Sequence, residues 1–260
     1  MIERLKNAVI ENKDNLSYIN LDSNNNYKGW TSNFGIKLPN DEYMKLDLKK
    51  ENDLFLLFVL ASSWSKTGQW ENAAFFTTYL KYYDKNKLDL WLDDDFIDDE
   101  IQNRKKNASK FTSICSEIEP RKKVSFRKDY FSSVRNLVIE WNNIKKSLKL
   151  SEIEGNYKIF INIIYKIKGL GTGENKMKIK IPLILRELRC QSVYKEIPGK
   201  YCCVPDARVK EAAKQLNIKL PHPNSISKLL EASEVIYKHF GDLYDIPLFA
   251  YQDLKNKNLL

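Results

Sequence analysis

Histidine and cysteine are both scarce in this chain of 260 residues. There are two histidines, His222 and His239, and four cysteines, none of which belongs to a C-x-x-C pair. This scarcity argues against a tetrahedral zinc site, an iron–sulfur cluster and histidine-based acid–base chemistry. We therefore expect reduced thiols and a protein that works without a metal or another cofactor. The cysteines are Cys115, Cys190, Cys202 and Cys203.

Long apolar runs are also missing, since no segment approaches the length that would cross a bilayer. The first residues, MIERLKNAVIENKDN, carry acids and amides and lack the apolar region of a signal peptide. We expect a soluble, cytoplasmic protein without a membrane partner.

Glycine is limited to nine residues and long strand-like alternation is rare, which predicts an all-α fold. The length suits one compact helical domain over 1–260, with possible lobes at 1–150 and 151–260. Residues 14–39 are expected to be irregular. The expected helices cover 1–10, 40–48, 53–64, 70–83, 99–118, 126–148, 207–217 and 225–240, with a further helix or its lead-in from 88 to 91.

The net charge is +9, with 43 basic and 34 acidic residues. The basic residues gather in RKKNASK, PRKKVSFRK and YKIKGLGTGENKMKIK, and the acidic ones in LDDDFIDDE, Leu92–Glu100. Two interpretations remain open: a solvated basic surface that follows from composition, or a surface for a polyanion such as DNA. The acidic run fits no EF-hand spacing, and a solvated acidic loop is the favoured interpretation.

The segment NYKIFINIIYKIKGLGTGENKMKIKIPLILRELRC centres on a glycine-rich turn. Its first half is either a strand, from its β-branched content, or a helix with an isoleucine stripe. We favour a helix, a glycine hairpin and a second helix over about 157–190. Pro182 marks either the start of the second helix or a kink within it.

A glycine hairpin can present several backbone N–H groups to a phosphate oxygen, although a simple turn is the alternative. The segment lacks the G-K-[ST] ending of a phosphate-binding P-loop. Lys176 and Lys178 add positive charge beside it. The candidate phosphate-binding residues are Gly169, Gly171, Thr172, Gly173 and Lys178.

The stretch CCVPDARVKEAAKQL places Asp206 where an apolar run ends and a helix begins. A carboxylate there either caps the helix, a contribution of roughly 1 kcal/mol, or takes part in chemistry. Arg208 either pairs with a carboxylate or reaches a phosphate.

The order of a helix, a glycine hairpin, a lysine-bearing helix and an Asp at a helix start resembles the helix-hairpin-helix DNA glycosylases. Lys176 precedes Asp206 by 30 residues, which is similar to the archaeal 8-oxoguanine DNA glycosylases (archaeal GO glycosylases). Three further stretches resemble that family: LASSWSKTGQWENAAFF, EIPGKYCCVPDARV and DIPLFAYQDL. Together they run from about Asp53 to Leu254.

The resemblance implies two helical lobes around a cleft and a double-stranded DNA partner with a modified base, bound by a monomer. The base would be flipped out of the duplex. Asp206 would stabilise the charge that develops on the sugar, and Lys176 would attack the sugar carbon to form a Schiff base. Roles in DNA repair or in defence against foreign DNA with modified bases are hypotheses that follow from it.

The sequence departs from the family at several positions. Leu183 stands where the family has a second lysine, and Lys178 is an alternative to Lys176 as the nucleophile. Gln252 or Asp253 occupies the place of a base-holding acid, and the tryptophan that follows in the family is missing. These departures leave the identity of the excised base open. The aromatic candidates for base stacking are Trp30, Trp64, Trp70 and Tyr251, for which core packing is the alternative.

Overall fold

The computed structural model describes residues 1–16, 18–64, 70–117, 124–170 and 179–260. These residues are mostly helical, and the strands among them are the two-residue pair β1 (Ile36–Lys37) and β2 (Ser116–Glu117). The predicted all-α class is therefore confirmed. No helix in the described ranges is both long and apolar enough to cross a bilayer.

The chain divides into two compact units, one formed by residues 1–30 with 177–260 and the other by residues 31–176. These bounds differ from the predicted lobes at 1–150 and 151–260, because the N-terminal helix α1 (Ile2–Glu11) packs on the C-terminal helices α9 (Ile226–Phe240) and α10 (Ile246–Asn256). We call the two parts the terminal unit and the central unit.

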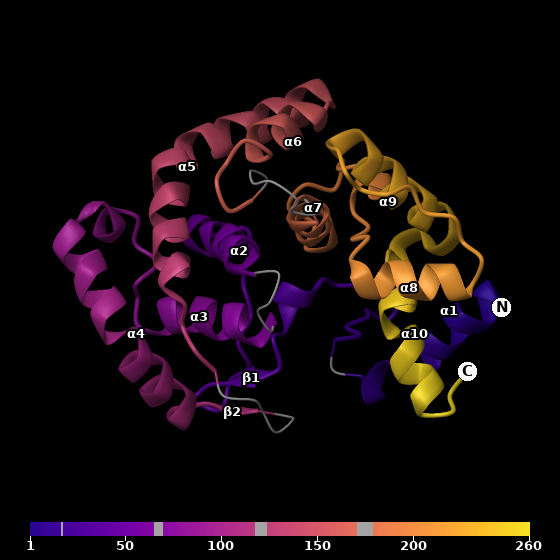
Figure 1. Ribbon diagram of the computed structural model, residues 1–260, viewed down its shortest axis with the longest axis horizontal. Coiled ribbons are helices and arrows are strands. Elements are labelled where there is room, and N and C mark those ends of the chain that lie inside the picture. Colours follow the sequence, from indigo (N-terminus) through magenta and orange to yellow (C-terminus); the bar gives the residue numbers. More distant parts are fainter. Residues whose placement is uncertain (17, 65–69, 118–123, 171–178) are drawn as a thin grey trace. The chain divides into compact units, whose positions relative to one another are not determined.

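The central unit is built around α2 (Glu51–Ser63), which packs against α3 (Trp70–Tyr82) and α5 (Lys128–Glu154) (Figure 1). The run from Phe55 to Ala61 in α2 is fully buried, as its apolar sequence predicts. The rings of Phe55 and Phe58 meet Trp141 of α5 edge-on, with ring centroids 5.2 and 5.4 Å away. Its helices are α2 (Glu51–Ser63), α3 (Trp70–Tyr82), α4 (Asp94–Ile114), α5 (Lys128–Glu154) and α6 (Lys158–Ile164).

The helix α5 ends at Gly155, whose left-handed φ of 63° lets the chain turn back into α6. Residues 158–164 are helical, so the helical alternative for this segment is the correct one. Phe160, Ile161 and Ile164 are buried against the rest of the unit. The helices α5 and α6 thus form a helical hairpin.

The terminal unit contains α7 (Lys180–Cys190) and α8 (Ala207–Gln215) in addition to α1, α9 and α10. Pro182 lies in the first turn of α7, where a proline costs no helical hydrogen bond. Of the two interpretations of Pro182, the one in which the helix starts near it is therefore correct. The helix α10 packs on α8 and α1, while α9 packs on a 3₁₀ turn at Gly199–Tyr201.

The prediction of a helix over 40–48 is wrong. This segment is extended: the N–H of Met44 donates to the carbonyl of Ile36 at 2.8 Å, and Asp41 has a positive φ of 66°. Met44, Leu46 and Leu48 are buried, whereas the residues between them are exposed. That period of two is typical of an extended segment and was present in the sequence.

Candidate functional site

The candidate site lies in the terminal unit, where the chain runs from the Gly199–Tyr201 turn into α8. Cys202, Cys203 and Val204 are buried and extend toward Asp206, the residue before the helix. A Cβ atom on Gly199 would lie 2.4 Å from the ring of Tyr237 in α9, so a larger residue would require that ring to shift. The segment Cys202–Asp206 is called the α8 approach below.

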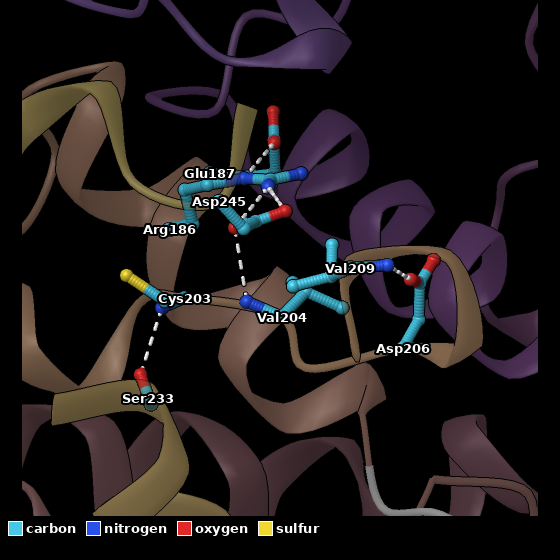
Figure 2. Close-up of polar contacts among 8 residues, drawn as sticks. All are labelled: Arg186, Glu187, Cys203, Val204, Asp206, Val209, Ser233 and Asp245. Carbon is cyan, nitrogen blue, oxygen red and sulfur yellow. Dashed lines mark hydrogen bonds and ion pairs between the residues drawn. The ribbon is translucent and has the colours of Figure 1, made fainter. Parts of the chain in front are cut away.

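Asp206 caps α8, because its Oδ1 accepts the N–H of Val209 at 2.8 Å (Figure 2). This confirms the capping interpretation. The side chain is only partly buried. Burial raises the pKa of the Asp206 carboxyl above its ordinary value, and the negative charge of Asp245 raises it further, while the N–H groups of Val209 and Arg208 act in the opposite direction.

Two side chains from distant parts of the unit hold the α8 approach by its backbone. The N–H of Cys203 donates to Ser233 Oγ of α9 at 2.9 Å, and the N–H of Val204 donates to Asp245 Oδ1 at 2.9 Å. Both hydrogen bonds are buried, so neither N–H group is left unsatisfied beside the apolar side chains. The position of the Asp206 backbone is therefore set from the interior of the unit.

Asp245 is itself held by Arg186 of α7. One guanidinium nitrogen, Nη1, donates to both oxygens of the Asp245 carboxylate, at 2.9 and 3.0 Å, and Nε approaches Glu187 Oε1 at 3.4 Å. All three side chains are buried. Figure 2 shows Asp245 between the guanidinium and the N–H of Val204, so one buried carboxylate links α7 to the α8 approach.

Asp245 and Arg186 were not among the predicted site residues. A signal was present in the sequence, because Arg186 and Glu187 interrupt the apolar run IPLILRELRC, and charged residues in such a run are usually paired. The identity of the partner, Asp245, was not contained in that signal.

Arg208 pairs with a carboxylate, as one of the two alternatives expected, and its contact with a phosphate stays a prediction. Its Nη2 binds Asp253 Oδ2, its guanidinium carbon lies 4.3 Å from the ring centroid of Phe249, and Tyr18 donates its hydroxyl to the same Asp253 oxygen. Burial, together with the bond to Asp253, raises the pKa of Tyr18 well above its usual value. Arg208 and Asp253 are each about one-third exposed and so are accessible to a ligand.

A cavity of about 350 Å³ opens beside this ion pair, between α8 and α10. Arg208, Gln252 and Asp253 line it together with Tyr251. The structure therefore brings three predicted site residues and one stacking candidate to a single cavity. Asp206 does not line it, although it lies two residues from Arg208.

The other predicted residues are distributed as follows. Gly169 has a φ of 94°, and Trp64 is the partly buried residue that ends α2; both belong to the central unit. Trp70 begins α3. Outside the described residues lie Lys176, Lys178, Gly171, Thr172 and Gly173. The pairing of Lys176 with Asp206 therefore stays a prediction.

No group of three or more His, Cys, Asp or Glu side chains in the described ranges is arranged to hold a metal ion. Comparisons of the chain with family models, with curated proteins and with solved structures gave no significant match.

Proposed function

We propose that this protein is a DNA N-glycosylase that flips a modified base out of double-stranded DNA and excises it, with Asp206 as the catalytic carboxylate. The proposal includes a helix-hairpin-helix arrangement over about 157–190, in which α6 and α7 flank the glycine-rich turn. It is supported by the resemblance of the PDARV stretch and the hairpin segment to that enzyme class and by the net charge of +9.

One observation carries the catalytic part of the proposal: Asp206 is a partly exposed carboxylate whose backbone is fixed by a buried hydrogen-bond network. Cleavage of a glycosidic bond develops positive charge on the sugar. A carboxylate held in place beforehand stabilises that charge without reorganising, and partial burial strengthens the interaction.

The second step of the proposed reaction requires an amine. Lys176, or Lys178 in the alternative register, would attack the sugar carbon, release the base and leave a Schiff base that permits strand cleavage. The amine attacks only when neutral, so its pKa must be lowered by burial or by nearby cations. Lys178 and Lys180 provide such cations in the sequence beside Lys176.

The test is an excision assay on duplexes that carry 8-oxoguanine, uracil, an alkylated base or a hypermodified cytosine. We expect base release from at least one duplex and loss of release in Asp206→Asn. Because Asn caps a helix as well as Asp does, this variant should fold and bind the duplex as the unmodified protein does. Retention of full excision by Asp206→Asn would show that Asp206 serves only as a cap.

Borohydride trapping distinguishes the two lysines. Lys176→Gln should abolish the covalent adduct while Lys178→Gln retains it, and the reverse result would assign the nucleophile to Lys178.

A non-catalytic DNA-binding module is the second candidate. It is favoured by the bonds that Arg208 and Tyr18 make to Asp253, because Asp253 is one of the two residues in the place of the base-holding acid. Salt-sensitive duplex binding with neither base release nor an adduct across the panel would support this candidate over the enzyme.

A further inference from the structure

A groove of about 650 Å³ runs along the surface of the central unit between α5 and α6. Ile139 and Leu150 of α5 line it with exposed fractions of 61% and 44%. Ile159 and Ile163 of α6 line the other side and are partly buried. These four aliphatic side chains line the same groove, so apolar surface from two helices is gathered in one place. We call this feature the α5–α6 groove.

The groove has the spacing that accepts a helix. Its lining residues on α5 recur at three- and four-residue intervals from Asn136 to Leu150, and Ile159 and Ile163 on α6 are four residues apart. Such positions form one stripe along each helix. The α5 stripe runs from Asn136 to Leu150, which is 14 steps along the helix or about 21 Å at 1.5 Å per residue. An amphipathic helix of three to four turns would fill this length.

The rim of the groove is basic. Three exposed lysines line it, Lys146, Lys166 and Lys168. Across the described ranges none of the three ammonium groups forms an ion pair with a carboxylate. The carboxylate among the lining residues, Glu140, accepts a hydrogen bond from Asn143 at 3.0 Å. The charge around the apolar floor is therefore positive overall.

From this combination we infer that the α5–α6 groove binds an amphipathic helix of a partner protein that carries acidic residues along the edges of its apolar face. The aliphatic floor provides burial for the apolar face, and the lysines favour acidic over basic partners by charge complementarity. This inference does not rest on the glycosylase proposal. The α6 side of the groove lies within the 157–190 segment of the proposed helix-hairpin-helix arrangement, so the variants that test the groove are placed on α5, outside that segment.

The probe is a fluorescent 14-residue helical peptide with leucines at helical spacing and glutamates beside them, and its counterpart has lysines in place of the glutamates. We expect the acidic peptide to bind the full chain about tenfold or more tightly than the basic one, by fluorescence anisotropy. Raising the salt concentration should reduce this difference, because the rim charges are exposed.

The chain offers matched controls on α5 itself. Ile139→Glu should abolish binding, whereas Ile153→Glu, at a residue 72% exposed that does not line the groove, should leave it unchanged. Lys146→Glu should weaken binding of the acidic peptide several-fold, and Lys149→Glu, an exposed position outside the groove, should have little effect. All four positions are exposed, so circular dichroism should show unchanged folding.

Three outcomes would overturn the inference. One is the absence of acidic-peptide binding. Another is an equal loss of binding in Ile139→Glu and Ile153→Glu. A third is self-association of the chain in sedimentation analysis that Ile139→Glu abolishes, because a second copy would then occupy the groove. An excision assay on the same variants keeps this result separate from the proposed function, since Ile139→Glu should retain any base release.

Discussion

Arg186 and Asp245 form a buried ion pair in which one guanidinium nitrogen donates to both carboxylate oxygens, at 2.9 and 3.0 Å. The same carboxylate accepts the N–H of Val204 in the approach to α8. Asp245 therefore stabilises two elements at once, and its removal would leave a buried cation and a buried N–H group without their partner.

Asp245→Ala should lower the free energy of unfolding by about 3–5 kcal/mol, the cost of breaking a buried pair by removing one member. Denaturant unfolding followed by circular dichroism measures this. Asp242→Ala is the control, because the Asp242–Arg189 pair is partly exposed and its loss should cost about 1 kcal/mol or less. Equal losses in the two variants would contradict the structural role of Asp245.

Asp206→Ala should lower the free energy of unfolding by about 1 kcal/mol, because the N–H of Val209 loses its acceptor at the start of α8. Asp206→Asn should keep the stability near that of the unmodified protein, since an amide oxygen accepts the same bond. Thermal unfolding of both variants provides the measurement. A large loss in Asp206→Asn would show that the carboxylate charge, and not the cap, stabilises the fold.

The stability of the protein should depend on pH through Asp206. Its pKa is higher in the folded chain than in the unfolded chain, so the folded state holds the proton over a pH range where the unfolded state has lost it. The contribution of Asp206 to the free energy of unfolding is therefore greatest below the pKa that it has in the unfolded chain. This contribution decreases as the pH rises through the pKa that it has in the folded chain.

Asp206→Asn removes this dependence, so its stability relative to the unmodified protein should improve as the pH rises from about 4, the ordinary Asp pKa. Unfolding curves at several pH values measure the difference. Direct titration of the carboxyl by NMR checks the direction of the shift, and a carboxyl that titrates at or below the ordinary Asp value would contradict it.

Gly199→Ala should destabilise the fold by about 1–3 kcal/mol, because the new methyl group would overlap the ring of Tyr237. A double-mutant cycle tests the cause. In a Tyr237→Ala background the same glycine substitution should cost markedly less, since the ring is absent. An unchanged cost would indicate that the backbone, and not the ring, requires glycine.

Local patterns predicted the helices well where one physical cause dominated. The apolar run in α2 predicted a buried helix, and Ser225 was predicted to start α9, where its side chain accepts the N–H of Lys228. The segment 40–48 was assigned to a helix although Met44, Leu46 and Leu48 alternate with polar residues, a period of two that is typical of an extended chain. The helix α10 was not predicted, since DIPLFAYQDL resembled a family motif without a clear helical start.

The helical class, the positive charge and the carboxylate at the start of α8 could be predicted from the amino-acid sequence, because each depends on composition or on residues a few positions apart. Tertiary structure alone decided that Asp245 pairs with Arg186, that Arg208 pairs with Asp253 and that α5 and α6 leave a groove between them. The first two pairs join residues 59 and 45 positions apart. A local pattern states which face of a helix is apolar, but the packing of helices decides which charged groups meet in the interior.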